Sequence, residues 1–162
     1  MRHAKAAAQS PSGQDHDRPL ARRGQVDAGF MAEILEQLGW SPAQVVSSDA
    51  MRTRQTWMWM SQARPLPVQV ELHRGLYLAG LSAIQRVARG WDSDQKGPVL
   101  VLGHNPGWEM AASQLSGQQI GMTTANAILL TGEGPSWSAA LHKPWKLVHQ
   151  LVPKHIRAHG LD

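Results

Sequence analysis

The sequence of 162 residues contains no cysteine. This absence excludes disulfide bonds, thiolate metal ligands and a cysteine nucleophile, and it is compatible with a reducing compartment. There is no run of about 18 or more apolar residues that would form a membrane-spanning helix. The first residues also lack the apolar core of a signal peptide. We therefore expect a cytoplasmic protein with no membrane partner.

Phenylalanine and tyrosine are scarce, with one of each, whereas tryptophan occurs seven times. We interpret most of the tryptophans as core or groove-wall residues. Hydrophobic residues make up 42% of the chain and charged residues 17%, which is ordinary for a globular protein. Because this length suits one domain with a real core, we expect a single domain over residues 1–162.

The net charge is +4 and the calculated pI is near 10.0. This balance favours anionic partners, which include phosphates, nucleic acids and acidic proteins. The basic residues are scattered, and no recognised nucleic-acid motif occurs, so nucleic acid is the weakest of these partners and we expect none.

Short apolar segments alternate with segments of helical periodicity. Helices are expected within 18–40, 50–63, 81–91 and 107–117, and strands within 44–48, 67–72, 97–107 (a strand and a tight turn), 126–132, 136–142 and 146–153. Short apolar strands that alternate with helices are typical of an α/β sheet covered on both faces.

Three places combine charged or titratable side chains with the ends of these elements. Arg2 and His3 open the chain, Arg52 lies where a strand gives way to a helix, and His104 stands at the carboxyl end of a strand. Ligands of open α/β sheets bind beyond the carboxyl ends of the strands, so these side chains are expected to converge. The backbone amides that open the two following helices would add affinity for an anion.

Such a set of side chains is suited to phosphoryl transfer. Arginine forks match phosphate oxygens bidentately and stay charged at any working pH. A neutral imidazole can attack phosphorus in line and form a covalent phosphohistidine, which water then hydrolyses. The guanidinium groups supply the positive charge, so we expect no metal and no other cofactor.

Six stretches of the sequence carry a resemblance to a known family. They are "RHAK", "DHDRPLARRGQVDA", "SSDAMRTRQT", "LYLAG", "VLVLGHNPGWE" and "MTTANAILL". In this order they resemble the histidine phosphatase superfamily, and specifically its short SixA-type phosphohistidine phosphatase branch. The resemblance implies a three-layer α/β/α sandwich with a mostly parallel central sheet, as in phosphoglycerate mutases.

The resemblance also implies a role for each candidate residue. His3 is the phosphorylated nucleophile, and Arg2 and Arg52 hold the phosphate. His104 is the second histidine of the site, which binds phosphate or assists proton transfer. Arg18 is an additional phosphate contact at the rim, where a purely structural role is about equally well supported.

Taken singly, each candidate has a structural interpretation as a solvated tail, an exposed arginine at a helix start or a strand-end histidine; only the joint pattern favours a site. Asp15, His16 and Asp17 are expected to form a turn and a helix start rather than a metal site. Surface positions are expected for Arg22, Arg23, Arg54, His73, His142, His149, His155 and His159.

A general acid is the least determined part of the mechanism. Glu71 and Glu109 are the candidates, and Glu109 lies in the first turn of a helix, where an acid is favourable for electrostatic reasons alone. A phosphoramidate leaves readily once its imidazole is protonated, so it requires less help from an acid. No residue is assigned this role.

Members of the family carry a short apolar strand before the Arg-His pair, and here only Met1 precedes it. One explanation is that Met1 is an internal methionine, and that the codons upstream encode roughly four to seven mostly apolar residues. The other is a true truncation, which would expose ladder groups of both neighbouring strands. We favour the first explanation and expect the first strand of the sheet to be missing from residues 1–162.

The sequence therefore predicts a metal-independent phosphatase that acts through a phosphohistidine intermediate. Its expected substrate is phosphohistidine on a protein, such as a histidine phosphotransfer domain in a signalling relay, because the chain has no room for the capping insertions that enclose small substrates. The alternatives are a phosphatase of a small phosphate ester and a non-catalytic module that only binds phosphate.

Overall fold

The computed structural model describes residues 1–94 and 97–161. Its helices are α1 (Arg22–Gln37), α2 (Met51–Ala63), α3 (Leu81–Val87), α4 (Gly107–Ser116), α5 (Trp137–Ala140) and α6 (Pro153–His159). Its strands are β1 (Gln44–Ser48), β2 (Val70–His73), β3 (Val99–Leu102), β4 (Ala127–Thr131) and β5 (Lys146–Leu151), and the 3-10 helices are η1 (Asp15–Asp17), η2 (Arg74–Leu76) and η3 (Ala88–Gly90). None of the helices in this part of the chain is both long and apolar enough to span a bilayer.

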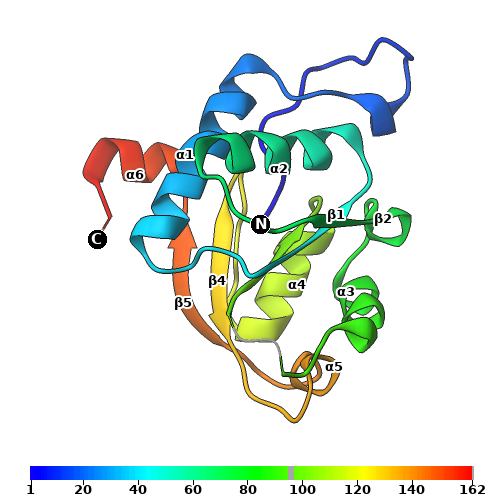
Figure 1. The fold of residues 1–162 in the computed structure, drawn as a ribbon, viewed down its shortest axis with the longest axis vertical. Helices are drawn as coiled ribbons and strands as arrows, with labels where there is room; N and C mark the ends of the chain where they lie inside the picture. Colours follow the sequence, from blue (N-terminus) through cyan, green and yellow to red (C-terminus); the bar gives the residue numbers. More distant parts are fainter. Residues whose placement is uncertain (95–96, 162) are drawn as a thin grey trace.

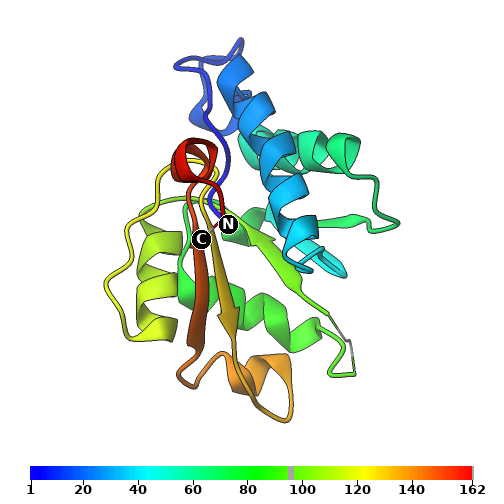
Figure 2. The same cartoon turned by 90° about the vertical axis from the view of Figure 1, so that its left-hand side faces the viewer.

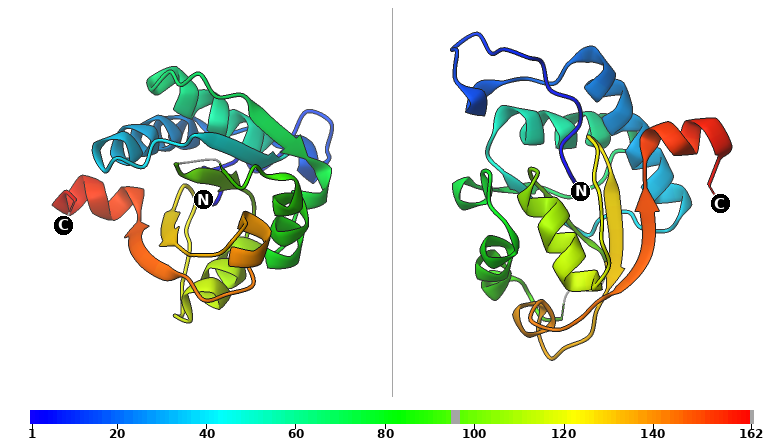
Figure 3. Two further views of the ribbon diagram at one scale, coloured as in Figure 1. Left: turned by 60° about the horizontal axis from the view of Figure 1, so that its bottom comes forward. Right: turned by 180° about the vertical axis from the view of Figure 1, so that it is seen from behind.

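The strands lie between two layers of helices (Figures 1 and 3). β1 pairs in parallel with β2 on one side and with β3 on the other, while β4 and β5 form an antiparallel pair. Because side chains alternate along a strand, Val45 joins the core beneath α1 and α2, and Val46 joins the core on the side of α3 and α4. The predicted α/β/α sandwich with a mostly parallel sheet is confirmed.

The first three residues run between β3 and the segment that leads into β4 (Figure 2). On one side the His3 N–H donates to the Gly103 carbonyl at 3.0 Å, and Arg2 pairs with Gly103 in the parallel direction. On the other side the Arg2 N–H donates to the Asn126 carbonyl, also at 3.0 Å. Arg2 and His3 are thereby fixed to two separate parts of the sheet.

Beyond Met1, the interval between β3 and β4 is an apolar cavity of about 180 Å³. Side chains of both strands line it, together with residues of α1 and α4. Among the described residues, no strand pairs with β3 and β4 along this interval.

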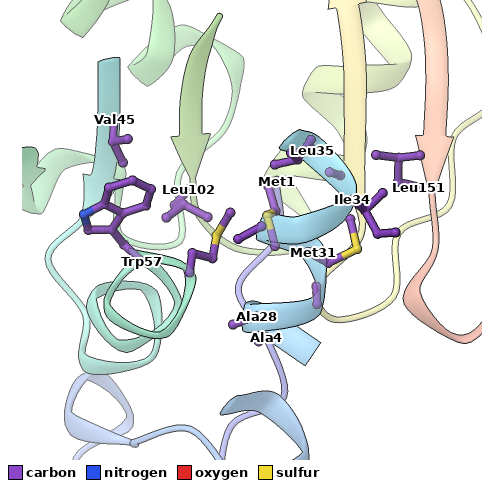
Figure 4. Close-up of a cluster of buried hydrophobic side chains, with 14 of the residues drawn as sticks. Met1, Ala4, Ala28, Met31, Ile34, Leu35, Val45, Trp57, Leu102 and Leu151 are labelled. Atoms are coloured by element: carbon purple, nitrogen blue, oxygen red, sulfur yellow. The ribbon is translucent and has the colours of Figure 1, made fainter. Parts of the chain in front are cut away.

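Met1 itself belongs to the core. Its side chain is 8% exposed and packs in the cluster that contains Met31 and Leu35 of α1 and Leu102 of β3 (Figure 4). The helices α1 and α2 both contribute to this cluster, which includes the buried Trp57 and Met60 of α2. The N-terminal segment is therefore held by side-chain packing as well as by its backbone hydrogen bonds.

One predicted strand was wrong. Residues 136–142 were expected to be extended, but α5 (Trp137–Ala140) forms there instead. The Ser136 hydroxyl accepts the N–H of Ala139, which is the hydrogen bond of a helix N-cap. The expected helix over 81–91 also ends early, at Val87, and continues as η3. The strand over 44–48 coincides with β1, and the helix over 50–63 contains all of α2.

Candidate active site

The sheet topology brings the candidate residues to one edge. β1 and β3 run parallel and end at Ser48 and Leu102, so the segments after both strands leave the sheet on the same side. The first of these segments leads to Arg52 in the first turn of α2, and the second leads to His104. His3 lies next to the second, because its backbone pairs with Gly103.

His3 is 9% exposed, and its ring is oriented by a local hydrogen bond. Nδ1 lies 2.7 Å from the carbonyl oxygen of Ala4, which can only accept, so Nδ1 carries the proton. Nε2 is therefore unprotonated and keeps its lone pair. Burial lowers the pKa of His3 to about 4, and the positive charges of Arg52, Arg2 and Arg18 add to the lowering, although the bond to Ala4 opposes it. The ring is neutral at neutral pH.

His104 faces His3, with ring centroids 5.3 Å apart. It is 1% exposed, and its Nε2 lies 2.9 Å from the hydroxyl of Ser48. Burial lowers the pKa of His104 to about 3, and the charge of Arg52 lowers it as well. Two neutral imidazoles thus stand side by side within reach of arginine charges.

The arginines are held by backbone carbonyls. Arg2 Nη1 donates to the Met122 carbonyl at 2.7 Å, and its Nε is buried with no hydrogen-bond partner in the described part of the chain. Arg52, which is 3% exposed, donates from Nη1 to the Asp15 carbonyl at 2.7 Å. Arg18 donates from Nε to the Ala7 carbonyl at 2.8 Å. These bonds fix the three guanidinium groups before any ligand binds.

Asp15, which was expected in a turn and helix start, also belongs to this cluster of side chains. Its carboxylate accepts from the Tyr77 hydroxyl at 2.6 Å, from Arg18 at 2.8 Å and from Arg52 at 3.0 Å. The bond from Tyr77, followed by those from the two arginines, holds the pKa of Asp15 well below its usual range. The spacing Asp15-x-x-Arg18 within the quoted "DHDRPL" stretch was the available signal, but the contact with Arg52 spans 37 residues.

Tyr77, the sole tyrosine, also belongs to the cluster. Its ring lies edge-on to His104 and to His16, and Arg52 lies 5.7 Å from the ring centroid. The loop that carries Tyr77 packs against the start of α4, where Gly107 leaves no room for a side chain against Ala79. The "LYLAG" stretch carried the family resemblance, yet nothing in it indicated that its tyrosine would reach Asp15.

Glu109, a candidate acid, supports the loop that holds Arg2. Its carboxylate accepts the N–H of Met122 at 2.7 Å and the side-chain amide of Asn105 at 3.1 Å. Glu71 lies within β2 and bonds to Gln44 at 2.9 Å, so it does not belong to the cluster.

Arg54 is exposed on α2, whereas Arg52 is buried. Of the residues expected at the surface, these are exposed: Arg22, Arg23, Arg54, His142, His155 and His159, with His73 and His149 half-buried.

The assembled cluster has the chemistry of an anion site. Three guanidinium groups and two neutral imidazoles converge, and one imidazole has a free lone pair on Nε2. Within residues 1–94 and 97–161, no group of three or more His, Asp or Glu side chains is arranged to hold a metal ion. The arrangement can grip a tetrahedral oxyanion and present a nucleophile to it.

Comparison with known proteins identifies the family. The family model "Histidine phosphatase superfamily (branch 1)" matches residues 1–76. An uncharacterised chloroplastic protein of Arabidopsis thaliana is 36% identical over 165 residues, which cover 94% of this chain and 76% of that protein. The chain belongs to the histidine phosphatase superfamily. It is therefore a phosphatase, a hydrolase of phosphate compounds.

Two solved structures agree with this assignment. A protein of Nakamurella multipartita described as a phosphohistidine phosphatase SixA is 28% identical, has a TM-score of 0.77, and is matched over 94% of this chain and 93% of that one. The structure of the protein histidine phosphatase SixA with tungstate has a TM-score of 0.78 at 21% identity, with 96% of each chain covered. The predicted likeness to the SixA branch is confirmed at the level of fold.

Proposed function

We propose that this phosphatase works without a metal through a phosphohistidine formed on His3, and that its substrate is phosphohistidine on a protein. The observation that carries the proposal is the hydrogen bond from His3 Nδ1 to the Ala4 carbonyl at 2.7 Å. It fixes the tautomer that leaves Nε2 free to attack. The lowered pKa of His3 keeps that nitrogen unprotonated at neutral pH.

The reaction has two steps. In the first, the lone pair of His3 Nε2 attacks phosphorus in line, and the N–P bond forms while the bond from phosphorus to the substrate imidazole breaks. The departing imidazole keeps the bonding electrons and takes a proton. In the second, water attacks phosphorus, the N–P bond breaks, and inorganic phosphate and neutral His3 are released. Arg2, Arg18 and Arg52 stabilise the charge on the equatorial oxygens in both steps.

No carboxylic acid is assigned to protonate the leaving group. Asp15 is ionised and bound to two arginines, and Glu109 is already bonded to Met122 and Asn105. An alkoxide leaving group would require such an acid, whereas an imidazole that is protonated from solvent leaves readily. This difference supports a phosphoramidate over a small phosphate ester.

The match in size to the SixA structures supports a protein substrate, such as a histidine phosphotransfer domain of a signalling relay. The Asp15 side chain at the rim is 47% exposed, which leaves the cluster approachable by a protruding side chain of a partner.

A cytoplasmic location is a further prediction, which imaging of the tagged protein in its native cell would test; the Arabidopsis relative is described as chloroplastic.

The test compares two substrates at equal phosphate concentration, a phosphotransfer domain phosphorylated on histidine and a sugar phosphate. We expect kcat/KM for the phosphorylated domain to be at least about 10²-fold higher, on the scale that positioned acid catalysis contributes to ester cleavage. The Arg54→Lys variant serves as a folded control with an unchanged rate. Equal or higher kcat/KM for the sugar phosphate would overturn the substrate assignment. Phosphate binding without turnover of either compound would show a non-catalytic module.

A further inference from the structure

Ser48 ends β1 and is fully buried, and its hydroxyl has two neighbours. The N–H of Ala50 donates to Oγ at 3.3 Å, and His104 Nε2 lies 2.9 Å from Oγ. The carbonyl oxygen of Ser48 already accepts from the hydroxyls of Ser47 and Thr53, each at 2.8 Å. Among the described residues, His104 Nε2 is thus the one acceptor bonded to the Ser48 hydroxyl.

The two possible proton arrangements leave different numbers of buried groups unpaired. If the Ser48 O–H donates to His104 Nε2, the ring proton is on Nδ1, and of the polar groups of this pair only that N–H has no partner among the described residues. If Nε2–H donates to Ser48 instead, both the serine O–H and Nδ1 lack partners. Each unsatisfied buried group costs about 1–3 kcal/mol, so the first arrangement is favoured.

We propose that Ser48 is a positioning residue that fixes His104 as the Nδ1–H tautomer, so that His104 serves the phosphoryl group as a hydrogen-bond donor and not as a base. The use of this donor by a phosphoryl oxygen rests on the proposed function. The tautomer itself does not, because it follows from the contacts of Ser48. Burial keeps the ring neutral, so its one N–H must be the donor.

The two histidines are then complementary. His3 has its proton on Nδ1, bonded to Ala4, and presents a bare Nε2. His104 has its Nε2 bonded to Ser48 and keeps an unpartnered Nδ1–H. An entering phosphate oxygen would supply the acceptor that this N–H lacks in the resting protein. The same tautomer serves as nucleophile in one ring and as donor in the other.

The experiment reads the tautomer directly by long-range ¹H–¹⁵N NMR of protein labelled with ¹⁵N-histidine, without substrate. The His104 signals are assigned by their loss in His104→Gln. We expect the wild-type pattern of a ring protonated on Nδ1, and a shift of that nitrogen when inorganic phosphate is added. Protonation on Nε2 in the wild type would overturn the proposal, whatever the activity.

The variant Ser48→Ala should change His104 to a mixture of tautomers and lower kcat by about tenfold or more, as loss of an orienting partner typically does. Ser47→Ala is the matched control, since Ser47 is equally buried but bonds only to a backbone carbonyl. It should keep the wild-type tautomer and rate. An unchanged His104 tautomer in folded Ser48→Ala would overturn the proposal. Absence of turnover in a wild type with the Nδ1–H tautomer would instead count against the proposed function alone.

Discussion

His3 and His104 face each other at 5.3 Å, but the protein holds the two rings in different ways. His104 follows β3, which pairs with β1, and a serine from β1 binds its ring. His3 lies in the segment Met1–His3, and the carbonyl of the next residue along the chain binds its ring. The local bond engages Nδ1 of His3, whereas the bond from Ser48 of β1 engages Nε2 of His104.

The surroundings of the two rings are otherwise alike. Both are buried, and burial lowers both pKa values, to about 4 for His3 and about 3 for His104. Burial and charge alone would therefore give both residues the same chemistry. The difference between the two rings is the nitrogen that a hydrogen bond engages, and in our proposal this difference separates the nucleophile from the donor.

Removing each imidazole in turn should have the largest effect on turnover and should distinguish the two histidines most clearly. His3→Ala should abolish turnover, because it removes the Nε2 lone pair that the proposed mechanism uses as the nucleophile. His104→Ala should slow the reaction but leave detectable phosphoryl transfer, because the three arginines remain. Single-turnover experiments with a phosphorylated phosphotransfer domain measure both. Turnover retained in His3→Ala would contradict the division of roles.

The positive charge of Arg52 lowers the pKa of both histidines, so a change at Arg52 affects both rings. Arg52→Lys keeps the charge but loses the planar fork that donates to the Asp15 carbonyl and carboxylate. We expect kcat to fall on the order of 10²–10³-fold, the loss typical of one charge-assisted contact in the transition state. Arg54→Lys is the control, since Arg54 is exposed and residues i and i+2 do not share a helix face. Near-wild-type rates for both variants would remove Arg52 from the site.

The depressed pKa values predict how stability depends on pH. In the unfolded chain the two histidines titrate near 6.5, and in the folded protein near 4 and 3. Between these values the unfolded state binds more protons than the folded state. The contribution of the two neutral histidines to the free energy of unfolding is therefore fully present above about pH 6.5 and decreases as the pH drops toward 4. Urea midpoints across this range measure the loss, which should reach a few kcal/mol at about 1.4 kcal/mol per pKa unit.

The pH experiment compares a variant of a surface histidine, as the control, with a variant that lacks both histidines of the site. His142→Ala, at an exposed position, should leave the slope of stability against pH unchanged. The double variant His3→Ala/His104→Ala should flatten it. A slope that stays steep in the double variant would assign the acid sensitivity to other groups.

The backbone before His3 gives the smallest expected effect. A designed extension of about four to six apolar, strand-forming residues before Met1 should pair with β3 and β4 and occupy the cavity of about 180 Å³. It would also replace the buried amino group of Met1, whose pKa burial lowers to about 5, by a peptide group. We expect stability to rise by about 1–3 kcal/mol in urea denaturation. An equally long polar extension is the control, and an equal gain from both would argue against strand pairing.

The sequence predicted those parts of the site that depend on local order along the chain. Arg52 and His104 follow strands with clear apolar patterns, so their placement at one sheet edge follows from the topology of a parallel sheet. Asp15 and Tyr77 were missed as partners because 62 residues separate them and neither has a periodic signal. The bond between Ser48 and His104 spans 56 residues and depends on the register of β1 against β3, which no pattern in the sequence specifies.

In the fold as well, some elements were predictable from local sequence and others were not. The strand over 44–48 contains the β-branched pair Val45 and Val46 between Pro42 and the polar run that begins at Ser47, so its place was predictable. Residues 136–142 alternate small and apolar side chains in a way that also fits a strand, but the Ser136 cap decided for α5. Serine is favoured at the N-cap of a helix, so the sequence contained a signal for α5. The strand was predicted because the alternating pattern was given more weight than this cap.

The central claim is that phosphorus is transferred to Nε2 of His3. The most direct test is to mix the protein with a ³²P-phosphorylated phosphotransfer domain, quench in alkali within the first turnover, and locate the label by peptide mass spectrometry and phosphoamino-acid analysis. We predict acid-labile, alkali-stable phosphate on His3 as the Nε2 isomer, and none in His3→Ala. Turnover that proceeds with no label on His3, or label on His104 instead, would contradict the account.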